Sequence, residues 1–169
     1  MMKQAVFILT MVLLQKILFS QNLNFQSYSS VQGLSQNSIY SIAQTKDGFM
    51  WFGTQDGLNR FDGRNFTSII PTLSDSNSKR IVGNKISKMI TALCADKDDW
   101  LWVGTTYEIL VYNRYSNTFL LPQNVFKGFR LPIGTWIAKI AEGSDNNLWI
   151  LTQKEGLFCY NKSSKNILR

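Results

Sequence analysis

The residues of this chain that could do chemistry are its carboxylates, because the sequence has no histidine. The lack of histidine removes the commonest general base and metal ligand, and with them any Ser-His-Asp or Cys-His arrangement. Two carboxylates are nevertheless enough for glycoside hydrolysis. The candidates with the most regular spacing are Asp47, Asp98 and Asp145, each of which stands four residues before a tryptophan.

These aspartates belong to one short motif that occurs three times. The copies read DGFMWFGT over residues 47–54, DDWLWVGT over residues 98–105 and DNNLWILT over residues 145–152. An aspartate at such a turn position caps backbone amides with its side chain. Asp56 and Asp62 stand in Asp-Gly turns of their own. We therefore expect structural roles for the carboxylates, no catalytic pair, and a chain that is not an enzyme.

The spacing of the motif predicts the architecture. Successive motif tryptophans are 51 and 47 residues apart, a period typical of propeller blades and solenoids. In the first repeat, strand-length runs at 38–43, 49–54, 58–61 and 65–70 are joined by Asp-Gly dipeptides. Asp-Gly supplies the positive φ that two-residue hairpin turns need, and four antiparallel strands in sequence make one propeller blade.

We expect an all-β fold, a partial β-propeller of about three four-stranded antiparallel blades, with almost no helix. The blades are predicted at about residues 33–70, 86–121 and 134–169. Residues 24–29 look like a spare outer strand, which in a full ring would complete the last blade.

The repeated tryptophans are predicted to pack between neighbouring sheets, where a large flat ring buries much apolar area. They are Trp51, Trp102 and Trp149. An aromatic platform for sugars is the alternative. Gly53 and Gly104, two residues further on, fit a close approach of another backbone. Leu151 takes their place in the third copy, which marks that copy as divergent.

The N-terminus reads as a secretory signal peptide over residues 1–20. Lys3 precedes an apolar run from Ala5 to Leu14, which is short for a membrane span. We expect cleavage after Ser20 and export of residues 21–169. An uncleaved anchor and a buried apolar strand are the alternatives.

The cysteine content and the net charge limit the bonds and partners that we expect for this chain. Cys94 and Cys159 stand in different repeats, and we expect buried free thiols, with a disulfide as the alternative that export permits. No metal-type cysteine pair is present, and no metal or cofactor is expected. Lys and Arg number 18 against 11 Asp and Glu, a net charge of +7. Because the positive residues are scattered, we expect no nucleic-acid partner.

The first repeat resembles a known family. Residues 33–42 (GLSQNSIYSI) and 47–62 (DGFMWFGTQDGLNRFD) are similar to the two-component regulator propeller repeat of Bacteroidetes hybrid two-component sensors. The resemblance implies seven-bladed propellers on the periplasmic side of the inner membrane of a Gram-negative bacterium. It also implies downstream β-sandwich, membrane-helix and histidine kinase domains, and sensing of an extracellular small ligand, frequently an oligosaccharide.

Three blades fall short of the four that the smallest propellers need. We therefore expect the N-terminal fragment of a longer sensor, whose kinase activity resides in downstream domains and which could form a homodimer in full length. Alternatives are copies that associate into a ring, a stand-alone secreted propeller that acts as an interaction scaffold, and a propeller-type lyase or glycosidase.

The ligand-binding residues are unknown at this level, because the resemblance does not tie them to the repeat motif. Trp100, Tyr107 and Trp136 are aromatic residues outside the repeated positions, near turns or loops. They could stack on a sugar, although ordinary packing is the favoured interpretation.

Overall fold

The computed structural model describes residues 3–4, 24–73 and 87–168, so the expected signal peptide falls almost wholly outside the described residues. The described part folds into three four-stranded antiparallel sheets and contains no α-helical element beyond residues 3–4. The strands are β1 (Ile39–Gln44), β2 (Met50–Thr54), β3 (Gly57–Phe61), β4 (Phe66–Ile69), β5 (Ile90–Ala95), β6 (Leu101–Thr105), β7 (Ile109–Asn113), β8 (Thr118–Leu120), β9 (Ile137–Glu142), β10 (Asn147–Thr152), β11 (Leu157–Asn161) and β12 (Asn166–Leu168).

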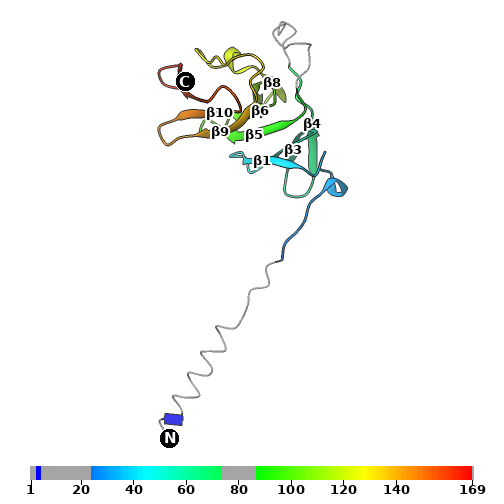
Figure 1. Ribbon diagram of the computed structural model, residues 1–169. Helices are drawn as coiled ribbons and strands as arrows, with labels where there is room; N and C mark the ends of the chain where they lie inside the picture. The colour runs from blue at the N-terminus through cyan, green and yellow to red at the C-terminus, as the bar shows by residue number, and fades with distance from the viewer. Residues whose placement is uncertain (1–2, 5–23, 74–86, 169) are drawn as a thin grey trace.

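Each sheet is a meander in which chain neighbours pair, in the orders β1-β2-β3-β4, β5-β6-β7-β8 and β9-β10-β11-β12. Two short 3-10 turns, η1 (Ser30–Gln32) and η3 (Pro122–Asn124), complete the elements. Figure 1 shows the sheets side by side, with β1, β5 and β9 succeeding one another. The same three strands are in contact, β1 with β5 and β5 with β9. The all-β prediction of three four-stranded propeller blades is confirmed.

One turn position explains why the motif begins with Asp-Gly, Asp-Asp or Asp-Asn. After the first strand of each sheet, Gly48, Asp99 and Asn146 have φ values of 89°, 65° and 65°. These values lie in the left-handed region, which glycine enters freely and which Asp and Asn tolerate better than other residues. The turn therefore accepts three different residues at one position without changing its geometry.

Trp51 and Trp102 fill the two spaces between sheets, as predicted. Trp51 is 2% exposed and lies 5.0 Å, edge to face, from the Tyr112 ring of the second sheet. Trp102 is fully buried in a cluster that includes Ile140 and Phe158 of the third sheet. Burial on this scale contributes on the order of 2–3 kcal/mol for each side chain.

The strand glycines let the sheets approach one another. A Cβ built on Gly53 would lie 2.7 Å from Cγ2 of Ile90, and one on Gly104 would lie 2.6 Å from Cγ2 of Ile137. Both isoleucines begin the inner strand of the next sheet. The prediction of a close backbone approach at these glycines is confirmed.

Polar contacts repeat along the same boundaries. The Lys46 amide of the first sheet donates to Oδ1 of Asp99 in the second at 3.0 Å. One blade on, the Lys97 amide donates to Oε2 of Glu142 in the third sheet at 2.7 Å. Each sheet thus binds its neighbour through an equivalent amide and a carboxylate.

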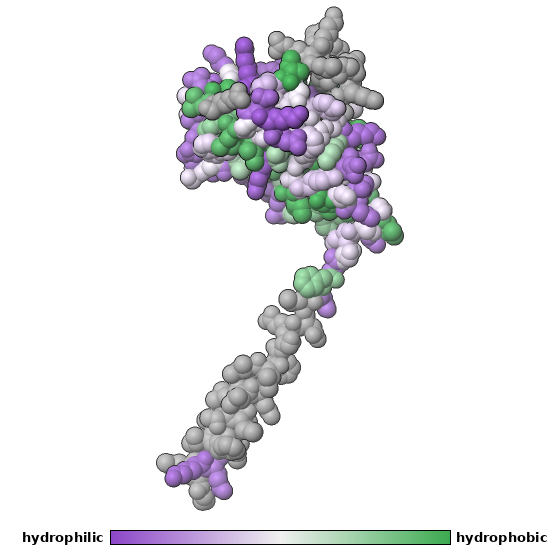
Figure 2. Space-filling model, in the orientation of Figure 1, coloured by the Kyte–Doolittle hydropathy of each residue, from purple (hydrophilic) through white to green (hydrophobic). Residues whose placement is uncertain are grey.

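The third tryptophan departs from the prediction. Trp149 is 40% exposed, and Leu151, which replaces the strand glycine, is also exposed. Trp149 pairs with Cys159 and Leu151 with Leu157, so all four side chains share one face of the third sheet. No sheet within the described residues covers that face, which removes both the burial of the indole and the need for glycine. Figure 2 shows that apolar residues also reach the surface elsewhere, between polar ones.

The opposite terminal face is covered in part by the N-terminal segment. Residues 24–29, expected as a spare outer strand, form no strand in this structure. Tyr28 packs instead on Phe61 and Phe66 of the first sheet, with ring centroids 5.1 and 5.5 Å apart. The Ser35 amide donates to Oδ1 of buried Asn59 at 2.9 Å. The role of residues 24–29 in another blade stays a prediction, since it needs a sheet with which to pair.

The equivalent tryptophans make a matched experiment. Trp51→Ala should lower the free energy of unfolding by about 3–5 kcal/mol, the usual loss for a fully buried aromatic side chain. Trp149→Ala should lower it by at most about 1 kcal/mol, because that ring is already partly in water. Urea denaturation of the two variants measures both values. Equal losses would contradict the assignment of Trp51 to the interior between sheets.

Candidate functional site

One cluster of carboxylates resembles a metal site but already contains a cation. Carboxylate oxygens of Asp96, Asp98 and Glu142 lie within 4.8 Å of one another. The Lys162 ammonium stands among them, at 2.8 Å from Asp96, 3.2 Å from Asp98 and 2.6 Å from Glu142. The chain itself therefore supplies the positive charge that these three groups could otherwise take from a metal ion.

The cluster joins the second and third sheets. Asp96 is buried, and besides Lys162 it accepts hydrogen bonds from the Trp102 indole at 2.7 Å and the Trp100 amide at 2.8 Å. Burial opposes the charge on Lys162, but hydrogen bonds to Asp96 and Glu142 outweigh it and raise the pKa of the ammonium. The lysine is thus a fixed cation that holds two sheets and the indole together.

Several other acids have the structural roles expected of them. Asp62 accepts from the amides of Arg64 and Asn65 at 2.8 and 2.7 Å, and these hydrogen bonds, Asn65 first, lower the pKa of Asp62. Asp145 accepts from the Asn147 amide. Asp98, expected to cap its turn, instead binds Lys162.

At the other end of the second sheet lies a pocket of about 950 Å³. Strand direction alternates in a meander, so the β6–β7 turn and the connection after β8 meet at the same end. The pocket lies between that turn and residues 121–137. Its volume and mostly apolar walls are typical of small-molecule sites.

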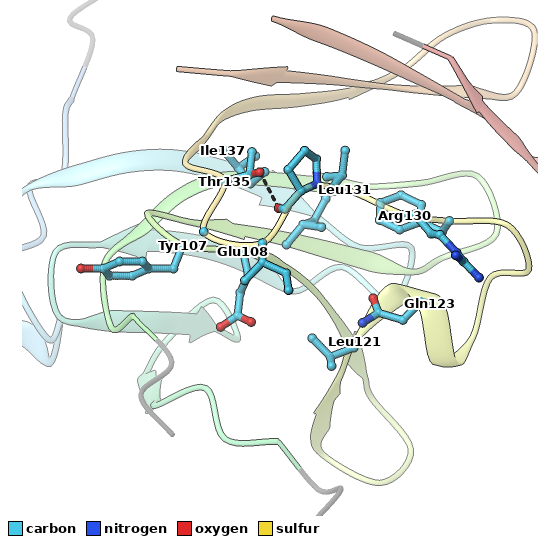
Figure 3. Close-up of a pocket in the computed structure, with 13 residues that line it drawn as sticks. Tyr107, Glu108, Leu121, Gln123, Arg130, Leu131, Thr135 and Ile137 are labelled. Carbon is cyan, nitrogen blue, oxygen red and sulfur yellow. Dashed lines mark hydrogen bonds between the residues drawn. The ribbon is translucent and has the colours of Figure 1, made fainter. Parts of the chain in front are cut away.

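The floor of the pocket is apolar, and its polar groups are few. Ile109, Leu121, Phe129 and Ile137 line it and are buried. The lining residues with polar side chains are Tyr107, Glu108, Gln123, Arg130 and Thr135. Figure 3 shows Tyr107 and Arg130 on opposite sides of the pocket, with Glu108 between Tyr107 and Leu121.

Glu108 is the unusual residue of this site. It occupies the turn position that glycine takes in the other repeats, at Gly57 and Gly156. Thr105 fixes the turn, because its hydroxyl accepts from the Glu108 amide and donates to the Glu108 carbonyl, both at 3.0 Å. Oε1 of the Glu108 side chain is buried and has no hydrogen-bond partner among the described residues. Burial raises the pKa of the carboxyl to about 7.

The wall formed by the connection is fixed by contacts with the core. Phe126 stacks on Trp102 with ring centroids 4.7 Å apart, and Phe129 lies 5.2 Å from Tyr160. A Cβ on Gly128 would lie 1.9 Å from the Lys165 carbonyl oxygen, so only glycine fits there. The connection therefore spans the second and third sheets and reaches the pocket with little freedom.

The sequence-predicted sugar-stacking residues do not gather in one place. Tyr107 lines the pocket and is 61% exposed. Trp136 stands between two lining residues but is not one of them. Trp100 packs edge-on against Phe126, 5.5 Å away, in the core cluster. Sequence reasoning missed Glu108, although its substitution for a turn glycine was a readable signal.

The cysteines are free, as expected, but half-buried rather than buried. Desolvation raises the pKa of Cys94 to about 11, which disfavours the reactive thiolate.

The sequence of this chain matches a known protein family and a known protein. Residues 33–56 and 84–107 match the family model described as two-component regulator propeller. Both matched segments are therefore similar to two-component regulator propeller repeats. Over 59 residues it is 44% identical to histidine kinase P4 of Formosa agariphila, a stretch that covers 35% of this chain and 4% of that protein.

Three solved structures share the fold of this chain. One is an extracellular domain described as part of the hybrid two-component system BT3049 of B. thetaiotaomicron (TM-score 0.65, 22% identity, 85% of this chain and 20% of that chain). A second, from BT4673 of the same organism, gives 0.64 and 22% over 88% of this chain and 18% of that one. The WD40 repeats of RRP9 give 0.53 and 14% over 86% of this chain and 43% of that one. WD40 repeats are propeller blades.

This chain thus covers only about a fifth of the length of each of the two bacterial domains. In the part of the chain that the structure describes, no helix combines the length and apolar character needed to cross a membrane.

Removal of the Lys162 ammonium should destabilise the folded chain. Lys162→Met would leave buried Asp96 and half-buried Glu142 without their counter-charge, and we expect a loss of about 3–5 kcal/mol in the free energy of unfolding. Lys154→Met, an exposed lysine of the β10–β11 turn, should change it by less than about 0.5 kcal/mol. Urea titration of both variants gives the comparison. A Lys162 variant as stable as its control would show that the cluster holds nothing together.

Glu108 should give the chain a recognisable pH dependence. Its folded pKa of about 7 exceeds the reference value of 4.5. The folded state therefore binds more protons between these values, and the contribution of Glu108 to stability is full below the lower value and falls as pH rises to the upper one. As the pH rises from 5 to 8, the melting temperature of Glu108→Gln should fall less than that of the parent chain. Glu155→Gln, in the equivalent turn of the third sheet, is the control. Parallel melting curves for the parent chain and Glu108→Gln would refute the burial of a titrating carboxyl here.

Proposed function

We propose that these repeats are the sensing part of a hybrid two-component sensor histidine kinase on the periplasmic side of the inner membrane of a Gram-negative bacterium. The observation that carries the proposal is the match of the regulator propeller model to two consecutive repeats. The matched relative is a histidine kinase. Since this chain has no histidine, phosphoryl transfer belongs to downstream domains, and the repeats themselves carry no catalysis.

The pocket beside the β6–β7 turn is the proposed sensing site. It combines a rigid apolar floor with a few polar groups, and one wall is anchored to both the second and the third sheet through Phe126 and Phe129. A ligand there would contact both sheets and bias how they sit against each other. A population shift of this kind is how binding is passed to a distant domain. Transmission through a homodimer of the full-length sensor belongs to the same proposal.

We propose an oligosaccharide as the signal. The exposed Tyr107 ring at the pocket edge offers a platform for the apolar face of a sugar. On the other side of the pocket, Gln123 and Arg130 are hydrogen-bond donors for hydroxyl groups.

A stand-alone secreted scaffold is the second candidate. The exposed face around Trp149, Leu151 and Leu157 favours it, because contiguous apolar surface marks interaction sites.

Transcription in living cells separates the two candidates. Cells that carry Tyr107→Ala in the full-length gene should lose the transcript response to one polysaccharide in a panel while keeping normal protein levels. Tyr115→Ala removes a more exposed tyrosine (87% against 61% for Tyr107) at the opposite end of the second sheet, and it should respond like the parent. If deletion of the whole gene leaves every transcript profile unchanged, the sensor role fails and the scaffold is favoured.

A further inference from the structure

The pocket contains a carboxylate whose charge nothing in the described chain balances. Glu108 lines the pocket, and its Oε1 is buried without a hydrogen-bond partner. A buried charge without a partner is expensive, and proteins avoid it by pairing or by protonation. Glu108 is therefore the feature of the pocket that calls for a specific group on a ligand.

Elsewhere the chain balances such carboxylates with ammonium groups. The Asp96 and Glu142 side chains, 0% and 7% exposed, bind the Lys162 ammonium at 2.8 and 2.6 Å. In the first sheet, Asp56 of the turn equivalent to the Glu108 turn pairs with Lys88 at 3.4 Å. Glu108 is half-buried, forms no salt bridge among the described residues, and borders an open pocket.

We propose that this pocket binds ligands that carry an ammonium group, which pairs with the Glu108 carboxylate while the body of the ligand lies on the apolar floor of Ile109, Leu121 and Ile137. The inference rests on the proposed sensing function and names the chemistry of its ligand. The negative charge is shared by both carboxylate oxygens, so a cation on the pocket side compensates it even though Oε1 itself is shielded.

An ammonium fits better than a hydroxyl group. A hydrogen bond to a charged group is roughly twice as strong as one between neutral groups, and the apolar walls strengthen the difference. Arg130 is the positively charged residue that lines the pocket, but it is exposed. Figure 3 places its guanidinium at the far side from Glu108, where it points away from the carboxylate.

Two sources could provide this group: an amino sugar within an oligosaccharide, or an amine on an apolar body. Two pairs of probes distinguish them. Glucosamine and glucose differ by an ammonium against a hydroxyl group on a sugar, and benzylamine and benzyl alcohol differ in the same way on an apolar ring. Each pair isolates the charge at nearly constant size.

Isothermal titration calorimetry on the full chain near neutral pH tests the proposal. At least one cationic probe should bind more tightly than its neutral match. Glu108→Gln, which keeps the shape and removes the charge, should weaken that binding at least about tenfold, the equivalent of one charged hydrogen bond. Binding of the neutral probe should not change. Glu155→Gln, whose residue does not line the pocket, should behave like the parent.

A second pair of variants leaves Glu108 in place. Ile133 is at the exposed rim of the pocket, 71% accessible, so substitutions there should not disturb folding. Ile133→Lys should weaken the cationic probe more than Ile133→Gln does, because it adds a like charge.

The proposal is overturned if neither cationic probe binds, if each neutral probe binds as tightly as its charged match, or if Glu108→Gln binds the cationic probe unchanged. None of these results touches the sensor role, which the transcript experiment decides separately. A neutral oligosaccharide that drives transcription through Tyr107 would keep the function and refute the ammonium.

Discussion

Everything in this structure depends on how one sheet is held against the next. At each boundary an indole on the second strand of one sheet packs on the sheet that follows, and a glycine two residues later lets the inner strands approach. Trp51 with Gly53, and Trp102 with Gly104, satisfy both conditions. The third copy satisfies neither, since Trp149 is partly in water and Leu151 fills the glycine position. The difference follows from what lies on each face, because the local strand geometry is the same in all three sheets.

The two ends of the second sheet differ in how their charged side chains are paired. At the end of the β5–β6 turn, three carboxylates share the Lys162 ammonium, and one of them, Asp96, accepts a hydrogen bond from the Trp102 indole. At the β6–β7 end, one acid has no such partner and borders a pocket. The stabilising cluster and the proposed sensing pocket thus lie at opposite ends of the second sheet, and the connection over residues 121–136 both packs on Trp102 and forms the pocket wall.

The fold could be predicted from the sequence because the turns, the tryptophans and the strand glycines recur in the repeats. Asp-Gly turns, the period of the tryptophans and the strand glycines predicted three four-stranded meander sheets. Burial of Trp149 was predicted wrongly, since a repeat motif does not say whether a neighbouring sheet is present. The pocket could not be predicted, because it depends on a non-repeated connection whose path is set by Phe126, Phe129 and Gly128. Among the residues that line the pocket, the sequence indicated only Tyr107 as a possible ligand contact.

Amide hydrogen exchange on the full chain tests the central claim most directly. The middle sheet is covered on both faces, so β6 (Leu101–Thr105) should exchange only through global unfolding. The third sheet has one open face, and β10 (Asn147–Thr152) should exchange faster through local opening. If β6 and β10 exchange at the same rate, packing of indoles between sheets does not set the stability of this chain.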